Sequence, residues 1–187
     1  LEVANQMFGG NGFNSILMKE LRVKRGYTYG AYSTLTSTAA RGLFSLSYAT
    51  EQNQLMNSIQ VAHQALNDFI TKPISQKQLD ETKEGMLRSF PMTFSSNANI
   101  NAQIAAIGFY HLPADYLTQY QKQLSLVTPQ QLQHAIQKNL RADRLTLVIV
   151  ANQLDQKALK DMLNNDVNSK KIFKPDTPNL IIKTTIR

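Results

Sequence analysis

A helix-to-strand corner at residues 20–33 constrains this 187-residue chain more than any other stretch. Glycine readily adopts the left-handed conformation that closes helices, so we expect a helix to end at Gly26. After Gly26, aromatic residues alternate with threonine and serine, a pattern typical of a strand. The residues before the corner recur at helical spacing and predict one largely apolar stripe: Phe13, Ile16, Leu17, Glu20, Leu21 and Lys24.

The corner places Arg22 in the last helical turn and Tyr29 early in the following strand, so we expect their side chains to converge. A guanidinium and a phenol that face one point offer hydrogen-bond donors to a carbonyl oxygen. The guanidinium charge strengthens this contact when the oxygen becomes an anion. A structural interpretation stays open, in which Arg22 satisfies carbonyl groups at the helix end and Tyr29 is an ordinary half-buried strand residue.

Two motifs carry a resemblance to a known family: the glycine-rich run 9–17, and the sequence Leu-Arg-x-x-Arg-Gly-x-x-Tyr at residues 21–29. Together they resemble the C-terminal half of the pitrilysin/insulysin type of zinc metallopeptidases, in particular the bacterial branch similar to mitochondrial processing peptidase. The likeness extends to about Ala151. It implies that Arg22 and Tyr29 are catalytic, holding carbonyl groups of a peptide substrate and stabilising the oxyanion.

The same family binds zinc in its N-terminal half through an H-x-x-E-H helix, a motif that is absent here. The histidines His63, His111 and His134 lie far apart, and none has a partner three or four residues away. We therefore predict no metal or other cofactor site within this chain. The resemblance implies that Zn²⁺ is held by a zinc-bearing N-terminal half or partner subunit, so we do not expect this chain to be catalytic alone.

Composition and charge limit the classes of binding partner and the cellular locations that we expect for this chain. The net charge is +7, but lysine and arginine are scattered without an interleaved aromatic stripe, which makes nucleic-acid binding a weak hypothesis. No apolar run approaches eighteen residues, so we expect no membrane span. The chain has no cysteine, and it begins without Met, as if inside a helix. We expect a piece of a longer, periplasmic or otherwise exported protein whose targeting segment is not in this chain, while a cytoplasmic location stays open.

The pattern of elements predicts an α+β fold, an antiparallel sheet covered by helices. Strands at 27–38 and 42–50 are expected to pair around residues 39–42, with Phe44, Leu46 and Tyr48 facing the core. The near-continuous apolar run at 144–151 predicts a central buried strand. The glycines at 9–12 predict a loop, and helices are expected at 1–8, 52–71, 75–90, 100–110, 116–124, 129–139 and 156–163.

The chain divides into an α+β domain at 1–163 and a linker and tail at 164–187. Residues 180–186 have strand composition. The sheet of the resembling family begins with one strand before the present N-terminus, and the tail is a candidate replacement for it. An edge strand and a disordered terminus both stay open.

Two hypotheses for function follow. The leading one is the C-terminal, substrate-binding half of a zinc-dependent endopeptidase that cleaves peptides and completes the active site of a zinc-bearing half. The alternative is a non-catalytic structural or interaction subunit of the same fold. The presence of both Arg22 and Tyr29 favours the first hypothesis. A homo-oligomer stays open in either case.

Overall fold

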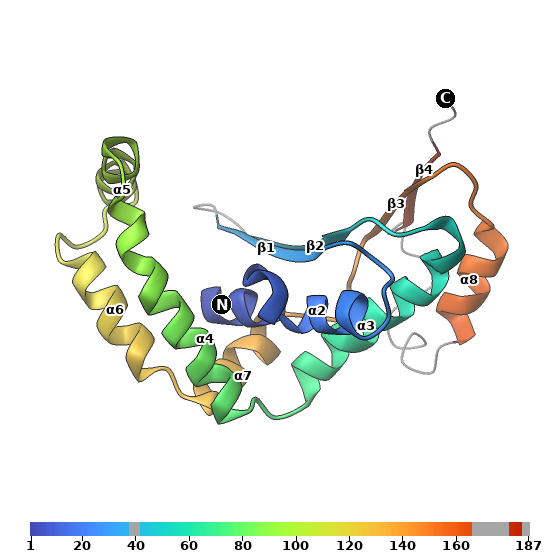
Figure 1. Ribbon diagram of the computed structural model, residues 1–187, viewed down its shortest axis with the longest axis horizontal. Helices are drawn as coiled ribbons and strands as arrows, with labels where there is room; N and C mark the ends of the chain where they lie inside the picture. The colour runs from blue at the N-terminus through green and yellow to red at the C-terminus, as the bar shows by residue number, and fades with distance from the viewer. Residues whose placement is uncertain (38–41, 166–179, 185–187) are drawn as a thin grey trace.

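The computed structural model describes residues 1–37, 42–165 and 180–184, and Figure 1 shows their path. The side chains of Ser37, of residues 163–165 and of β4 are not described. In chain order the elements are α1 (Glu2–Asn5), the π-helical η1 (Gln6–Gly10), the 3-10 turn η2 (Gly12–Asn14), α2 (Ile16–Met18), the π-helical η3 (Lys19–Val23), β1 (Ala31–Ser37), β2 (Gly42–Tyr48), the 3-10 turn η4 (Gln52–Gln54), α3 (Leu55–Thr71), α4 (Gln76–Ser89), the 3-10 turn η5 (Phe90–Phe94), α5 (Asn97–Phe109), α6 (Tyr116–Leu126), α7 (Pro129–Asn139), β3 (Leu147–Ala151), α8 (Gln156–Asn165) and β4 (Leu180–Thr184).

The helices predicted after residue 50 are present, with ends shifted by at most three residues. The prediction was most accurate for α7, because its start carries two strong signals. Thr128 and Gln131 form a reciprocal capping box, and Pro129 occupies the first helical position.

The loop predicted at residues 9–12 is not what forms. Gly9 and Gly10 lie inside the π-helical turn η1, and the helical path ends only at Asn11. The physical reason is close packing against β1: a Cβ added to Gly9 would lie 2.4 Å from the Ser33 backbone nitrogen. Glycine therefore lets the helix touch the strand, and it does not supply loop flexibility at this position.

The strands β1 and β2 pair antiparallel, with Ala31 opposite Tyr48 and Ser37 opposite Gly42. Phe44, Leu46 and Tyr48 pack against the core, as predicted from their alternation. The N-terminal helical segment, residues 2–23 from α1 to η3, and α3 cover this face of the ribbon (Figure 1). The predicted α+β fold with an antiparallel sheet covered by helices is thus confirmed, while the turn expected at 39–42 lies almost entirely outside the described residues.

The main core surrounds the N-terminal helical segment. The Phe8 ring lies 5.1 Å from the Phe69 ring of α3 and 6.0 Å from the Phe44 ring of β2. Fully or almost fully buried side chains from the N-terminal segment and from α3, α4 and α7 complete this core: Phe8, Leu17, Met18, Leu21, Leu66, Leu79 and Ile136. Three layers therefore pack around one cluster of aromatic rings: the ribbon of β1 and β2, the N-terminal helical segment, and the outer helices.

The strand predicted as central and buried is shorter and only half covered. In β3, Ile149 packs with Ile59 of α3 and Leu159 of α8, whereas Val148 and Val150 on the opposite face are exposed. β3 pairs in parallel with β4, from Leu147 opposite Leu180 to Ala151 opposite Thr184. The apolar run therefore reflected strand propensity rather than burial on both faces.

Helices α4, α5 and α6 extend together to one end of the molecule, as Figure 1 shows. None of the side chains of α5 is buried, and Ile104 and Phe109 are among the exposed apolar residues. No helix in the described ranges is both long and apolar enough to cross a membrane.

We expect Gly9→Ala to lower the free energy of unfolding by about 1–3 kcal/mol, because the added methyl group overlaps the β1 backbone. Gly85→Ala in α4 is the matched control. Its added Cβ would meet its nearest neighbour, Asn11 Nδ2, at 3.7 Å. Alanine is the better helix former, so this control should gain roughly 0.5–1 kcal/mol. Urea unfolding of both variants measures the difference, and equal stabilities would contradict the close packing at Gly9.

Deletion of residues 175–187 removes β4, the strand that pairs with β3. We expect the deletion to lower the stability of the chain, because the backbone groups of β3 that bond to β4 become solvent-exposed. Thermal unfolding and gel filtration of the truncated and complete chains test this. A truncated chain with unchanged melting temperature and unchanged size would rule out a structural role for the tail.

Candidate functional site

The Arg22 guanidinium lies over two aromatic rings at the end of η3. Its central carbon is 4.5 Å from the centroid of the Phe13 ring and 4.5 Å from that of the Tyr29 ring. Tyr29 is 87% exposed and Phe13 is 61% exposed, so the stack lies at the surface. The structure therefore brings together the two residues that the sequence nominated and adds a third.

The backbone between Arg22 and Tyr29 is held by a turn. Gly26 has a positive φ of 65°, and the backbone N–H of Tyr27 donates to the Leu21 carbonyl at 2.9 Å. Gly26 thus ends the helix as predicted. The Thr28 hydroxyl then donates to the Gly30 carbonyl at 2.8 Å and accepts from the Gly30 N–H at 3.1 Å.

This local ring of hydrogen bonds corrects the expected position of Tyr29. The residue precedes β1, which begins at Ala31, and does not lie within the strand. A serine or threonine hydroxyl that bonds the backbone two residues ahead favours a turn over a strand ladder. As a result the Tyr29 ring points out of the sheet, toward Arg22.

Phe13 was expected on the apolar helix stripe, and this prediction is wrong. It lies in the 3-10 turn η2, before the helix proper begins at Ile16. The Ser15 hydroxyl caps the new helix by accepting from the Met18 N–H, and it donates to the Gly12 carbonyl at 2.7 Å. Ser15 was the signal that could have shown the break, since serine at a helix start separates Phe13 from the following stripe.

Neighbouring charges distinguish Arg22 from the other cations of the corner. Glu20 pairs with Lys24 at 2.5 Å and with Arg25 at 2.7 Å. Partial burial alone would raise the pKa of Glu20, but the hydrogen bonds from Lys24 and Arg25 outweigh it and lower the pKa below the ordinary value. Within the part of the chain that the structure describes, Arg22 has no carboxylate partner.

This arrangement leaves a guanidinium ready to bind an oxygen. A cation over an aromatic ring face is attracted by the ring, and the N–H donors of a guanidinium lie in its plane, at the edge. The exposed Tyr29 hydroxyl adds one more donor beside it. The site therefore offers several donors and a positive charge to a carbonyl or an oxyanion.

The three histidines do not assemble into a metal site. His63 lies in α3 and His134 in α7, while His111 follows α5 with a positive φ of 51° at the end of that helix. Among the described residues no group of three histidine, aspartate or glutamate side chains is placed to hold a metal ion.

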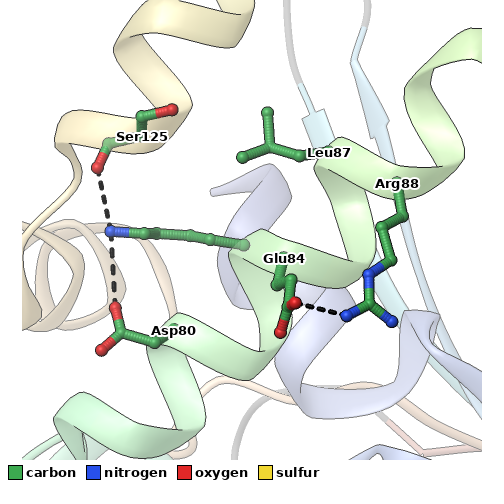
Figure 2. A pocket seen from close by; sticks show the side chains of 6 residues that line it. Asp80, Glu84, Leu87, Arg88 and Ser125 are labelled. Carbon is green, nitrogen blue, oxygen red and sulfur yellow. Dashed lines mark hydrogen bonds and ion pairs between the residues drawn. The ribbon is translucent and has the colours of Figure 1, made fainter.

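Away from Arg22, a hollow of about 490 Å³ lies between α4 and α6 and is shown in Figure 2. Lys83 donates to the carbonyl oxygens of Ser125 at 3.0 Å and Val127 at 3.2 Å, and it lies 3.6 Å from Asp80. Arg88 pairs with Glu84 on the same helix. Lys83 thus joins α4 to the C-terminal end of α6, whereas the pair of Arg88 and Glu84 lies within α4, and both are structural tasks.

Comparison with known proteins identifies relatives of this chain. Residues 1–86 match the model of the family described as the peptidase M16 inactive domain. A crystal structure of a peptidase M16 inactive domain from Pseudomonas fluorescens is 35% identical, with a TM-score of 0.70 over 75% of this chain and 34% of that chain. The resemblance inferred from the residue motifs is therefore confirmed.

Two further similar proteins carry different names, one that of a non-peptidase and the other that of a protease. The non-peptidase homolog YmxG of Helicobacter pylori is 26% identical over 151 residues, which cover 79% of this chain and 34% of the relative. The periplasmic protease PqqL of Escherichia coli is 18% identical, with a TM-score of 0.55 over 66% of this chain and 14% of that chain, and shows a likeness of fold alone. This chain thus spans about a third of the length of its curated relative.

We expect Glu20→Gln to lower the stability at pH 7 and to have a smaller effect at pH 3. A carboxylate whose pKa is lowered in the folded state contributes stability above its unfolded value of 4.5, and that contribution is lost as the pH falls through the folded value. Lys24 is exposed and Glu20 is only partly buried, so solvent screens these ion pairs and the difference at pH 7 should be about 0.2–1 kcal/mol. Urea unfolding at both pH values tests it, and an equal difference at pH 3 would contradict the assignment.

Proposed function

We propose that this chain, whose residues 1–86 belong to the family of peptidase M16 inactive domains, is the C-terminal, substrate-binding half of a zinc-dependent endopeptidase. In this role it completes the active site of a zinc-bearing half and does not cleave peptides alone. The observation that carries the proposal is the Arg22 guanidinium, which lies over the rings of Phe13 and Tyr29 and has no carboxylate partner in the described chain.

The proposed chemistry uses the donors of this stack. When water adds to the carbonyl carbon of a peptide bond, the carbonyl oxygen gains negative charge. The Arg22 N–H groups and the Tyr29 hydroxyl bind that oxygen more strongly as the charge develops, which lowers the barrier. The two rings hold the guanidinium in one orientation before the substrate arrives, so little ordering remains to be done during the reaction.

The proposed location of the metal takes into account which residues this chain does not contain. It has no H-x-x-E-H motif, and its described residues offer no metal-binding group. We therefore assign Zn²⁺ to a zinc-bearing N-terminal half or partner subunit, and the peptide substrate to the space between the two halves. The proposal extends to an exported location, which the name of the periplasmic protease PqqL supports.

A second candidate function is a non-catalytic subunit of the same fold. One observation favours it: the curated relative from Helicobacter pylori is named a non-peptidase homolog. In that case the aromatic stack would contact a protein partner instead of a scissile peptide bond.

We expect Arg22→Ala and Tyr29→Phe each to lower turnover by about 10- to 1,000-fold in the enzyme assembled with its zinc-bearing half, since each removes one donor to the oxyanion. Cleavage of a quenched fluorescent peptide library, with and without a chelator, measures it. Arg22→Lys keeps the charge but loses the planar fork, so it should restore little activity.

Arg88→Ala and Tyr110→Phe are the matched controls, because they remove an exposed guanidinium on α4 and an exposed phenol hydroxyl after α5. Both should leave turnover within about twofold of the unchanged enzyme, as surface substitutions usually do. Chelator-sensitive cleavage whose turnover is unchanged by both Arg22→Ala and Tyr29→Phe would refute the roles assigned to these residues. If no combination of halves cleaves any peptide, the non-catalytic subunit becomes the better interpretation.

A further inference from the structure

A groove of about 1110 Å³ lies beside the helix that carries Arg22. One wall is the segment from Ile16 to Arg25, the other wall is α3, and residues 72–78 close one end. Figure 1 shows α2 lying next to α3. No function proposed above uses this surface.

The walls have the form of two helix ridges. On the first wall the lining residues recur at Ile16, Lys19, Glu20 and Val23, and on α3 they recur every three or four residues from Gln60 to Phe69. Such rows are the ridges between which a further helix packs. A groove between two adjacent helices is also the usual seat of an amphipathic helix from a partner.

The floor of the groove is apolar. Ala65 and Phe69 are buried at its base, while Val61 and Ile74 are partly buried around them. Val23, which also lines the groove, is 65% exposed although it lies at the end of the helical turn η3. Apolar surface of this kind favours a partner with an apolar stripe.

The rim of the groove is charged, and its charges are unbalanced. Four cationic side chains and two carboxylates line it. The carboxylates are already used, because Glu20 pairs with Lys24 and Arg25 and Asp68 pairs with Lys72 at 2.7 Å. Within the described ranges Lys19 has no carboxylate partner, so the rim retains an excess of positive charge.

We propose that this groove docks an amphipathic helix of a protein partner, with an apolar stripe flanked by aspartate or glutamate. The apolar stripe covers Val23 and the floor, and the acidic flank faces Lys19. The occupant is a partner of opposite charge and not a second copy of this chain, whose net charge of +7 opposes self-association. The proposal does not depend on catalysis at Arg22.

The test is direct binding of a fluorescent probe peptide to the complete chain. The probe is about 14 residues long, or four helical turns, with leucines at positions i, i+3, i+4 and i+7 and glutamates on both flanks. A second probe replaces the glutamates with lysines, and a third scrambles the leucine positions. Fluorescence anisotropy at fixed salt gives the dissociation constants, and two-dimensional NMR identifies the residues contacted.

We expect the acidic amphipathic probe to bind at least about tenfold more tightly than either control peptide. Lys19→Glu and Val23→Asp should each weaken it about tenfold, and neither should disturb folding, because both side chains are exposed. Lys122→Glu on α6 makes the same change of net charge outside the groove and should weaken binding less than threefold, or about 0.6 kcal/mol.

Three results would overturn the proposal: equal affinity for the acidic and basic probes, an equal loss at Lys122→Glu, or NMR shifts confined to α5. Lack of binding by any probe would overturn it as well. Arg22→Ala separates this proposal from the one on catalysis. That variant should lose turnover in the assembled enzyme and still bind the acidic probe with unchanged affinity.

Discussion

The contact between the N-terminal helical segment and β1 is the constraint on which the rest of the structure depends. Gly9 has no side chain, so the helix lies directly on the Ser33 backbone. The Ser33 hydroxyl donates to the Asn5 side-chain oxygen at 2.8 Å, which fixes the helix along the strand. Because the same strand follows the Tyr29 turn and the same segment leads into the Arg22 helix, this contact sets the geometry of the candidate site.

Exposing the aromatic rings around Arg22 costs stability. An arginine with a purely structural role would not need such exposed rings beside it. Burying a phenylalanine side chain stabilises a protein by roughly 1.5–3 kcal/mol, and Phe13 forgoes most of that gain. A surface cation–π contact returns only about 0.5–1 kcal/mol. Stability alone therefore gives a weak account of the stack, and a ligand that meets the guanidinium edge gives a better one, whether the parent protein cleaves peptides or only binds them.

The sequence was most informative where one local signal decided the structure. The helix stop at Gly26, the alternation in β2 and the start of α7 were all predicted correctly, because each depends on a residue conformation, a period or a cap. Three predictions failed for a different reason: the loop at Gly9 and Gly10, the burial of β3, and the position of Phe13. Each of these depends on what packs against the segment from far along the chain, which no local pattern contains.

The convergence of Arg22 and Tyr29 lies between these two cases. Their spacing showed that they can meet, but not that the Thr28 hydrogen bonds hold Tyr29 in a turn before the strand, where its ring lies against the guanidinium. The sequence shows three cations close together at the corner, Arg22, Lys24 and Arg25, but not which of them are paired. In the structure Glu20 pairs with Lys24 and Arg25. Among the described residues of η3, the cations without a carboxylate partner are Arg22, beside its two aromatic rings, and Lys19, at the rim of the groove, so one short helix carries both proposed binding surfaces.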